Sequence, residues 1–172
     1  MRYAWLLLIG TAVPRVATAQ IPMALAGESA LVSETAAWAE GVEKEKTRLR
    51  RMDVRLPREA GEGSMLRRYT RGDAVLKLEA TYYSDTGRST HHYYVDDGKL
   101  RLAVLRASRY DRPRSQNVIA QRAEYLWFAG DSLMGWIDAD GVAVAGTEQR
   151  AATRAVEVSR DFQEKLALRT RR

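Results

Sequence analysis

Few residues of this chain have the types and spacing that chemistry needs, and the two histidines are the first candidates. His91 and His92 are adjacent, and the chain has no cysteine. Neighbouring side chains of a strand point to opposite faces, so this pair cannot easily hold one metal ion together. One histidine beside Asp85 or Asp96 would form a metal site. The better interpretation is that the histidines are half-exposed strand residues that pair across a hairpin. We therefore expect no metal, no cofactor and no thiol chemistry.

A basic segment, residues 99–122, is the second candidate. It contains a single acid, Asp111. Arginine forks match the geometry of carboxylate and phosphate groups, so such a segment can bind an anion or an acidic partner. The patch that we predict consists of Arg106, Arg109, Arg112 and Arg114. The alternative is a solvated loop in a chain that is rich in arginine throughout.

Aromatic residues crowd the same central part of the chain. Some of them must lie on each face of a sheet, because Tyr82-Tyr83 and Tyr93-Tyr94 are adjacent pairs. Core packing and cross-strand pairing explain most of them. The sharper hypothesis is an aromatic face that binds a ligand, made of Tyr83, Tyr93, Tyr125 and Trp127.

The remaining motifs do not identify a catalytic site. Asp138-Ala139-Asp140-Gly141 resembles part of a calcium loop but lacks the further ligands and the distal glutamate, so we interpret it as a turn. The chain has no Gly-x-Ser-x-Gly elbow and no glycine-rich phosphate loop. A carboxylate pair for glycoside hydrolysis is a spatial feature and stays open. We assign no catalytic residue and expect a binding protein rather than an enzyme.

The elements that must position these residues are mostly hairpins. Two alternating runs flank Asp96-Asp97-Gly98-Lys99, which predicts a tight turn at Asp97-Gly98. Closely spaced runs of this kind pair antiparallel. We expect an α+β fold: a single antiparallel β-meander of six to seven strands over about residues 52–138. It packs against an N-terminal helix (about 28–49) and a C-terminal helix (about 151–169), which cover its apolar face. A long polar loop is expected at residues 108–117.

The first 19 residues are typical of a signal peptide. An N-terminal arginine, a short apolar run and an Ala-x-Ala ending predict cleavage after Ala19. A membrane anchor is the alternative, but a span needs about 20 apolar residues and Gly10, Pro14 and Arg15 break this run. Residues 20–172 then form one domain, periplasmic or secreted in a bacterium, with no membrane span after cleavage. Export argues against nucleic acid as a partner.

Two stretches combine aromatic residues with a polar turn that contains glycine. They are Tyr93-Tyr94-Val95-Asp96-Asp97-Gly98-Lys99-Leu100 and the later Tyr125-Leu126-Trp127-Phe128…Leu133-Met134-Gly135-Trp136-Ile137-Asp138-Ala139-Asp140-Gly141. They resemble the hairpin blocks of a group of uncharacterised secreted bacterial proteins, with Tyr-Tyr-x-x-x-Gly-Lys-Leu followed by Trp-x-Asp-x-Asp-Gly. The resemblance implies a hairpin sheet between two helices and no particular activity. There is a weaker similarity to MORN-type repeats, whose fixed period this chain lacks.

Three functions are consistent with these patterns. The first is an exported, non-enzymatic binding or envelope-associated module, with an acidic envelope polymer or a protein as its partner. The second is a small-ligand carrier that uses the aromatic face. The third is a hydrolase whose carboxylates the sequence does not reveal. The oligomeric state is not indicated by any pattern.

Overall fold

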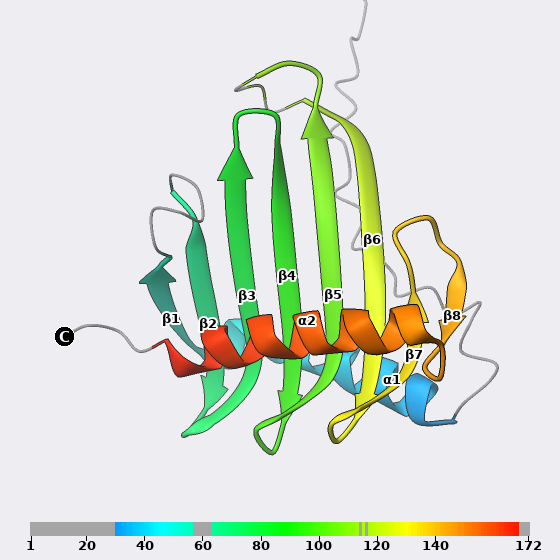
Figure 1. Ribbon diagram of the computed structural model, residues 1–172. Helices are drawn as coiled ribbons and strands as arrows, with labels where there is room; N and C mark the ends of the chain where they lie inside the picture. Colours follow the sequence, from blue (N-terminus) through cyan, green and yellow to red (C-terminus); the bar gives the residue numbers. More distant parts are fainter. Residues whose placement is uncertain (1–29, 57–62, 114, 116, 169–172) are drawn as a thin grey trace, which may run out of the picture.

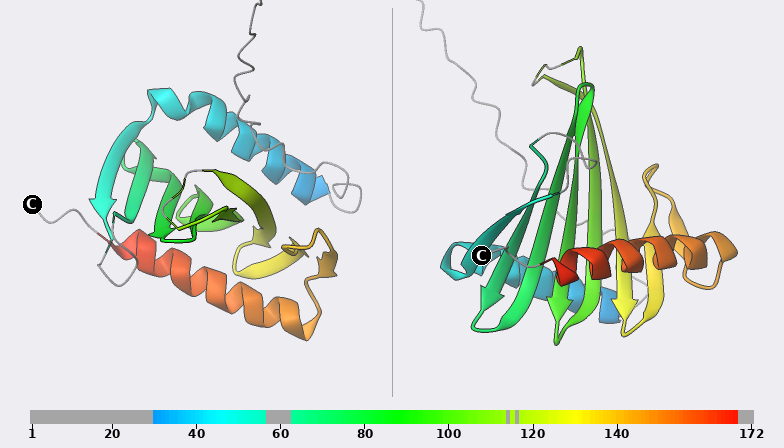
Figure 2. Two further views of the ribbon diagram at one scale, coloured as in Figure 1. Left: turned by 90° about the horizontal axis from the view of Figure 1, so that it is seen from above. Right: turned by 60° about the vertical axis from the view of Figure 1, so that its left-hand side comes forward.

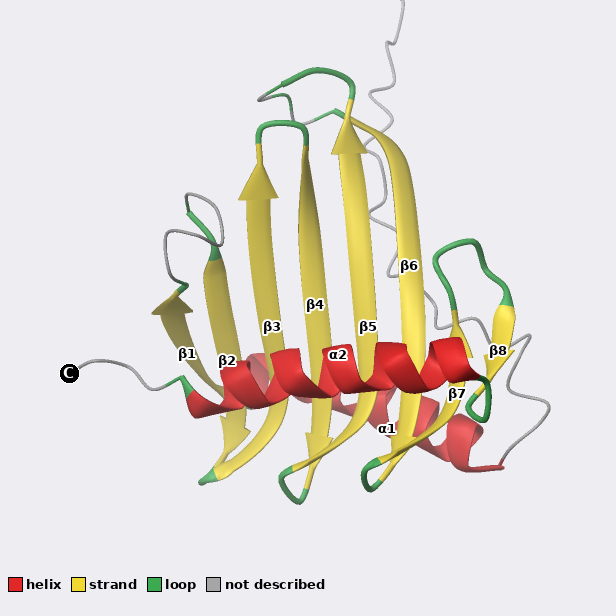
Figure 3. Cartoon of the chain, in the orientation of Figure 1, coloured by secondary structure: helices red, strands yellow, loops and turns green. Residues whose placement is uncertain are grey.

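The chain folds into one antiparallel sheet with two helices (Figures 1 and 3). The computed structural model describes residues 30–56, 63–113, 115 and 117–168. The predicted signal peptide lies outside the described residues. The helices are α1 (Ala30–Glu45), extended by the short 3₁₀ helix η2 (Lys46–Arg48), and α2 (Gln149–Ala167). The strands are β1 (Arg50–Arg55), β2 (Met65–Arg71), β3 (Ala74–Ser84), β4 (Gly87–Asp96), β5 (Lys99–Tyr110), β6 (Val118–Ala129), β7 (Ser132–Ile137) and β8 (Ala143–Ala145).

The described sheet has eight strands, not the six to seven expected, and they lie in chain order. The additional strand is β8, which pairs with β7 beyond the expected end of the sheet. It has three residues, which is too short for a periodic pattern in the sequence. The α+β class, the antiparallel meander and the two terminal helices are as expected.

The central hairpin turns where the sequence predicted. Asp96 pairs with Lys99, and the two residues between them have positive φ angles, 49° at Asp97 and 72° at Gly98. Two such residues in succession define a type I′ turn, whose twist matches that of the flanking strands. The tight turn at Asp97-Gly98 is confirmed.

The long polar loop begins later than expected. Strand β5 continues to Tyr110, and Arg109 pairs with Gly87 on one side and Ala120 on the other. Little apolar structure covers either face of this end of the sheet, so residues 108–110 are polar. They therefore lack the apolar alternation from which a strand is predicted. Arg109 is consequently held on a strand rather than on a loop.

The two helices lie on opposite faces of the sheet (Figure 2). The expectation that both cover one apolar face is wrong, and strand β5 shows why. Leu102 and Val104 are buried with α1 residues, whereas Ala103 and Leu105 are buried with α2 residues. Both faces of the central strands are apolar, so each needs its own cover. We call these faces the α1 face and the α2 face.

Each helix presents one stripe of buried side chains to its face. In α1 the buried stripe includes Thr35, Ala39 and Val42, at the spacing of successive helical turns. In α2 it includes Ala151, Val158 and Phe162. Phe162 packs against the Tyr93 ring, with the ring centroids 5.7 Å apart.

The helices cross one end of the sheet and leave the other end open. Strands β3 to β6 extend past both helices toward the β3–β4 turn and the loop after β5 (Figure 1). We call this part the open end of the sheet. Strands β1 and β8 form the two edges. Within the described residues, no helix has the length and apolar character that crossing a membrane requires.

Candidate functional site

A groove lies on the open end of the sheet and has a volume of about 620 Å³. Strands β3, β4, β5 and β6 contribute its lining. The lining residues are Tyr82, Tyr83, Ser84, Thr86, Gly87, Arg88, Ser89, Ala107, Ser108, Arg109, Ala120 and Arg122. It is a surface depression beside α2 rather than an enclosed cavity.

The strand register explains why the floor of the groove is low. Ser89 pairs with Ala107, which pairs with Arg122, while Arg109 pairs with Ala120. Paired residues project from the same face, so small side chains alternate with arginines across β5 and β6. The two alanines leave open space between the two arginine stems.

Gly87 is required where β4 begins. A Cβ atom at this position would lie 2.4 Å from the Ser108 carbonyl oxygen, which is backbone and cannot rotate away. Strand β5 therefore approaches β4 more closely here than any side chain would permit. Ser84 also donates a hydrogen bond from Oγ to the Gly87 carbonyl, at 3.2 Å, and this bond fixes the turn.

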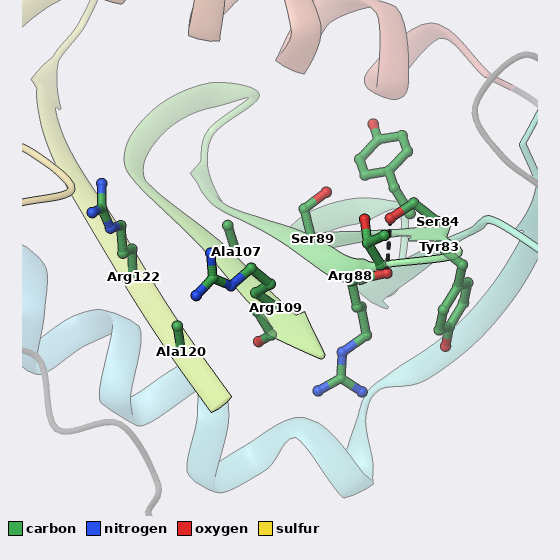
Figure 4. A pocket seen from close by; sticks show the side chains of 12 residues that line it. Tyr83, Ser84, Arg88, Ser89, Ala107, Arg109, Ala120 and Arg122 are labelled. Atoms are coloured by element: carbon green, nitrogen blue, oxygen red, sulfur yellow. Dashed lines mark hydrogen bonds between the residues drawn. The ribbon is translucent and has the colours of Figure 1, made fainter. Parts of the chain in front are cut away.

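The groove is positively charged. Three arginines line it, and no carboxylate does among the described residues. Figure 4 shows Arg109 and Arg122 on the side that faces α2, whereas Arg88 and Tyr83 point the other way. Arg122 forms an ion pair with Asp140 at 3.3 Å, and both side chains are largely exposed. In the described part of the chain, Arg109 forms no ion pair.

A polar cluster borders the groove where α2 crosses the sheet. Asp161 of α2 accepts hydrogen bonds from the Tyr93 hydroxyl and from Lys165 Nζ, the latter at 2.6 Å, and it lies 3.2 Å from His91 Nδ1. Tyr82 of the groove contacts the His91 ring, with the ring centroids 5.0 Å apart. We call these five residues the α2 clamp.

Electrostatics keep the Asp161 carboxylate of the α2 clamp ionised. Burial by itself would raise the pKa of Asp161, but the hydrogen bonds from His91, Lys165 and Tyr93 outweigh it and keep that pKa well below its usual range. Burial and the adjacent Asp161 carboxylate raise the pKa of Tyr93 far above its ordinary value. The Tyr93 hydroxyl thus stays a donor and Asp161 stays an acceptor.

A second charged cluster lies under α1, on the opposite face. Lys77 is completely buried and pairs with Glu43 of α1 and, at 3.3 Å, with Glu79. Glu79 also accepts from Lys46 at 3.0 Å and from Arg67 at 2.9 Å. We call these five residues the α1 cluster.

Burial also shifts the titration of the α1 cluster. It lowers the pKa of Lys77, and the Glu43 carboxylate offsets only part of this effect. Burial would raise the pKa of Glu79, but Lys77, His92 and Lys46 reverse the shift and lower it to about 2. A lysine with a lowered pKa can act as a nucleophile, but no substrate reaches Nζ of Lys77 because the side chain has no exposed surface. The cluster joins α1 to the sheet.

The structure separates the four arginines of the predicted patch. Arg109 lies in the groove. Arg106 is an odd number of residues away on the same strand, so it projects from the α1 face. Arg112 is exposed in the loop after β5, and Arg114 lies outside the described residues.

The predicted aromatic face is likewise divided. Tyr125 and Trp127 are buried under α1, stacked with their ring centroids 6.0 Å apart. Tyr93 is buried on the α2 face. Tyr83 is 43% exposed and lines the groove. These four residues do not surround a common pocket.

The two histidines point to opposite faces, as the strand geometry predicted. His91 joins the α2 clamp rather than Asp85 or Asp96. His92 lies on the α1 face, where burial first and Lys77 second lower its pKa to about 3. Over the described ranges, no three histidine or acidic side chains gather as a metal site would require.

Asp138 serves a turn between β7 and β8. Its Oδ1 accepts backbone hydrogen bonds from Asp140 at 3.0 Å and Val142 at 2.9 Å, and Gly141 takes a φ of 82°. The interpretation of this motif as a turn is confirmed. Its neighbour Asp140 has a further contact, the ion pair with Arg122 described above.

Arg122, Tyr82 and Ser89 were not among the predicted site residues. Arg122 belongs to the basic segment, but nothing in the chain order places it beside Arg109, thirteen positions earlier. The alternation of arginine and alanine in both strands is a signal, and it becomes readable only once the β5–β6 register is known.

No family model, no curated protein and no solved structure matches this chain. The resemblance to uncharacterised secreted bacterial proteins therefore stays a prediction.

Proposed function

We propose that this protein is an exported, non-enzymatic binding module whose groove takes acidic groups of a cell-envelope polymer. The observation that carries the proposal is the charge of the groove: Arg109 and Arg122 face one open depression, and no described carboxylate lines it. Arginine forks bind carboxylate and phosphate oxygens through two parallel hydrogen bonds. The signal-like sequence of residues 1–19 supports export.

The shape of the groove favours a polymer over an enclosed small molecule. The groove is open along the sheet surface, and its floor consists of small side chains such as Ala107 and Ala120. A carrier would bury most of its ligand. The aromatic residues that a carrier would use are occupied in the cores, since Tyr125 and Trp127 are 6% and 4% exposed.

The experiment compares the binding of the purified chain to alginate, dextran sulfate and neutral dextran. We expect binding to the two acidic polymers, weaker binding at higher salt because exposed charges are screened, and no binding to dextran. The double variant Arg109→Glu/Arg122→Glu should abolish the binding of both acidic polymers.

Arg160→Glu is the matched control. Arg160 is exposed on α2 and does not line the groove, so this variant should bind almost normally. Arg109→Glu alone makes the same change in charge as this control. Equal loss of polymer binding in these two single variants would mean that overall charge, not the groove, attracts the polymer. Failure of every acidic polymer to bind would reject the proposal.

One observation favours a hydrolase as the second candidate. The His91–Asp161 pair borders the groove, and Ser89 lies two residues from His91 on the same face. A Ser-His-Asp arrangement needs a hydrogen bond between serine and histidine, whereas His91 contacts Asp161 and Tyr93 here. Ester hydrolysis that Ser89→Ala abolishes would favour the hydrolase over the binding module.

A further inference from the structure

We infer that the acidic group recognised in the groove is a phosphate monoester carried by a sugar, clamped between Arg109 and Arg122. This inference rests on the proposed function and specifies its ligand. It depends on three observations: the diagonal relation of the two arginines, a described groove lining that contains no acid, and the contact between Arg122 and Asp140.

The register sets the distance between the two arginines. Arg109 pairs with Ala120, and Arg122 lies two residues further along β6 on the same face. Diagonal neighbours of this kind are about 7–8 Å apart at their backbones. Arginine side chains are long enough for two guanidinium groups to converge on one group above the alanines. The two arginines can therefore bind one anion between them.

The charge balance selects the kind of anion. One arginine fork satisfies a single carboxylate through two parallel hydrogen bonds, so a carboxylate would leave the second arginine uncompensated. A phosphate monoester carries about −1.5 to −2 charges at neutral pH and has three terminal oxygens. It can occupy both forks at once, and no described acid of the groove lining competes for them.

Asp140 contacts one of the two arginines, Arg122. It lies 3.3 Å from Arg122, and the two side chains are 70% and 68% exposed. Exposed pairs of this kind are weak, so a phosphate displaces Asp140 at little cost. Asp140 thereby weakens binding slightly and keeps Arg122 paired until the ligand arrives.

The rest of the groove fits a sugar. A volume of about 620 Å³ exceeds the needs of a lone phosphate and leaves room for the sugar that carries it, as one unit of a polymer. Ser84, Thr86 and Ser89 supply hydroxyl groups from β3, β4 and the turn between them, and hydroxyls both donate and accept hydrogen bonds as sugars require. A lipid headgroup could present the same phosphate, so the experiment must distinguish a lipid from a sugar as its carrier.

The experiment is a calorimetric titration of the full chain with glucose 6-phosphate, glucose, glucuronate and inorganic phosphate. We expect glucose 6-phosphate to bind at least about tenfold more tightly than glucuronate, since it gains a second arginine. Inorganic phosphate should bind more weakly than the ester, and glucose should not bind. Vesicles containing phosphatidic acid should not retain the protein.

Three variants and one control test whether Arg109 and Arg122 bind the phosphate together. Arg109→Gln and Arg122→Gln should each weaken glucose 6-phosphate binding about tenfold. Asp140→Asn should strengthen it about two- to fivefold by freeing Arg122. Arg160→Gln should leave it unchanged. Normal circular dichroism of each variant shows that a loss of binding is not a loss of fold.

The outcomes separate the ligand from the function. If glucuronate binds as tightly as glucose 6-phosphate, the groove binds anions but the inference of a phosphate monoester is wrong. Binding to phosphatidic acid vesicles in preference to the sugar phosphate would overturn the sugar as the carrier. If neither the small ligands nor the acidic polymers bind, the proposed function and this inference both fail.

Discussion

The hydroxyl of Tyr93 donates a hydrogen bond to Asp161, and this contact joins the middle strand of the sheet to α2. The Tyr93 ring is fully buried beneath the helix, while its hydroxyl reaches the border of the groove. The position of α2 on the sheet thus depends on a polar contact at the edge of the core.

Tyr93→Phe should lower the free energy of unfolding by about 1–2 kcal/mol, because it removes this hydrogen bond and keeps the ring. Urea denaturation measures the change. Tyr83→Phe is the control, since Tyr83 is 43% exposed and should change stability by less than about 0.5 kcal/mol. Equal effects in the two variants would mean that the contact with Asp161 contributes nothing.

Asp161 should make stability depend on pH in the acidic range. Its pKa is lowered from the ordinary value of 3.8 in the folded protein, so folding favours the ionised form. The stabilisation, about 2 kcal/mol, is fully present above the unfolded-state value and is lost as the pH falls through the lower folded-state pKa. Unfolding free energies of the wild type and Asp161→Asn should converge on acidification below pH 3.8. A constant difference between them across that range would contradict the prediction.

Lys77→Met should destabilise the protein by about 3 kcal/mol, because the buried Glu79 carboxylate and the partly exposed Glu43 carboxylate lose a partner that they share. Chemical denaturation gives the value. Lys44→Met is the matched control on α1, where the side chain is 79% exposed and should contribute almost nothing. A more stable Lys77→Met protein would mean that the cost of burying this charge exceeds its attraction to the two acids.

Gly87→Ala and Gly41→Ala should have opposite effects. The new Cβ at residue 87 would lie 2.4 Å from a backbone oxygen, which should cost about 1–3 kcal/mol. At residue 41, inside α1, nothing lies within 4 Å of the added Cβ, and alanine should stabilise the helix by about 0.5–1 kcal/mol. Thermal denaturation of both variants tests the pair. A neutral Gly87→Ala would show that β4 and β5 can separate here.

The full chain, expressed in a bacterial host, should be recovered from the periplasm with Gln20 as its first residue. Mass spectrometry of the intact protein identifies that end. Ala17→Asp/Ala19→Asp removes the small residues that cleavage needs and should leave the chain uncut. Recovery of an uncut wild-type chain from the cytosol would contradict export.

The sequence predicted the hairpins correctly, but it did not predict which face of the sheet each helix covers. Local rules suffice for Asp97-Gly98, where two residues decide the turn. Placement of the helices depends on residues 102–105, which are buried in succession. An unbroken apolar run does not reveal that alternate members need cover on opposite sides. For the groove, Arg109 was among the predicted residues, but its partner Arg122 becomes apparent only from the register of β5 with β6.

The open edge formed by β1 has a consequence for self-association. An exposed edge strand offers unpaired backbone groups to another chain, and such pairing leads to aggregation unless it is opposed. Arg50, Arg51 and Arg55 are exposed along this strand. A second copy that added its own β1 there would bring two sets of like charges together. This arginine-rich edge therefore opposes the growth of the sheet by β1-to-β1 pairing of two copies.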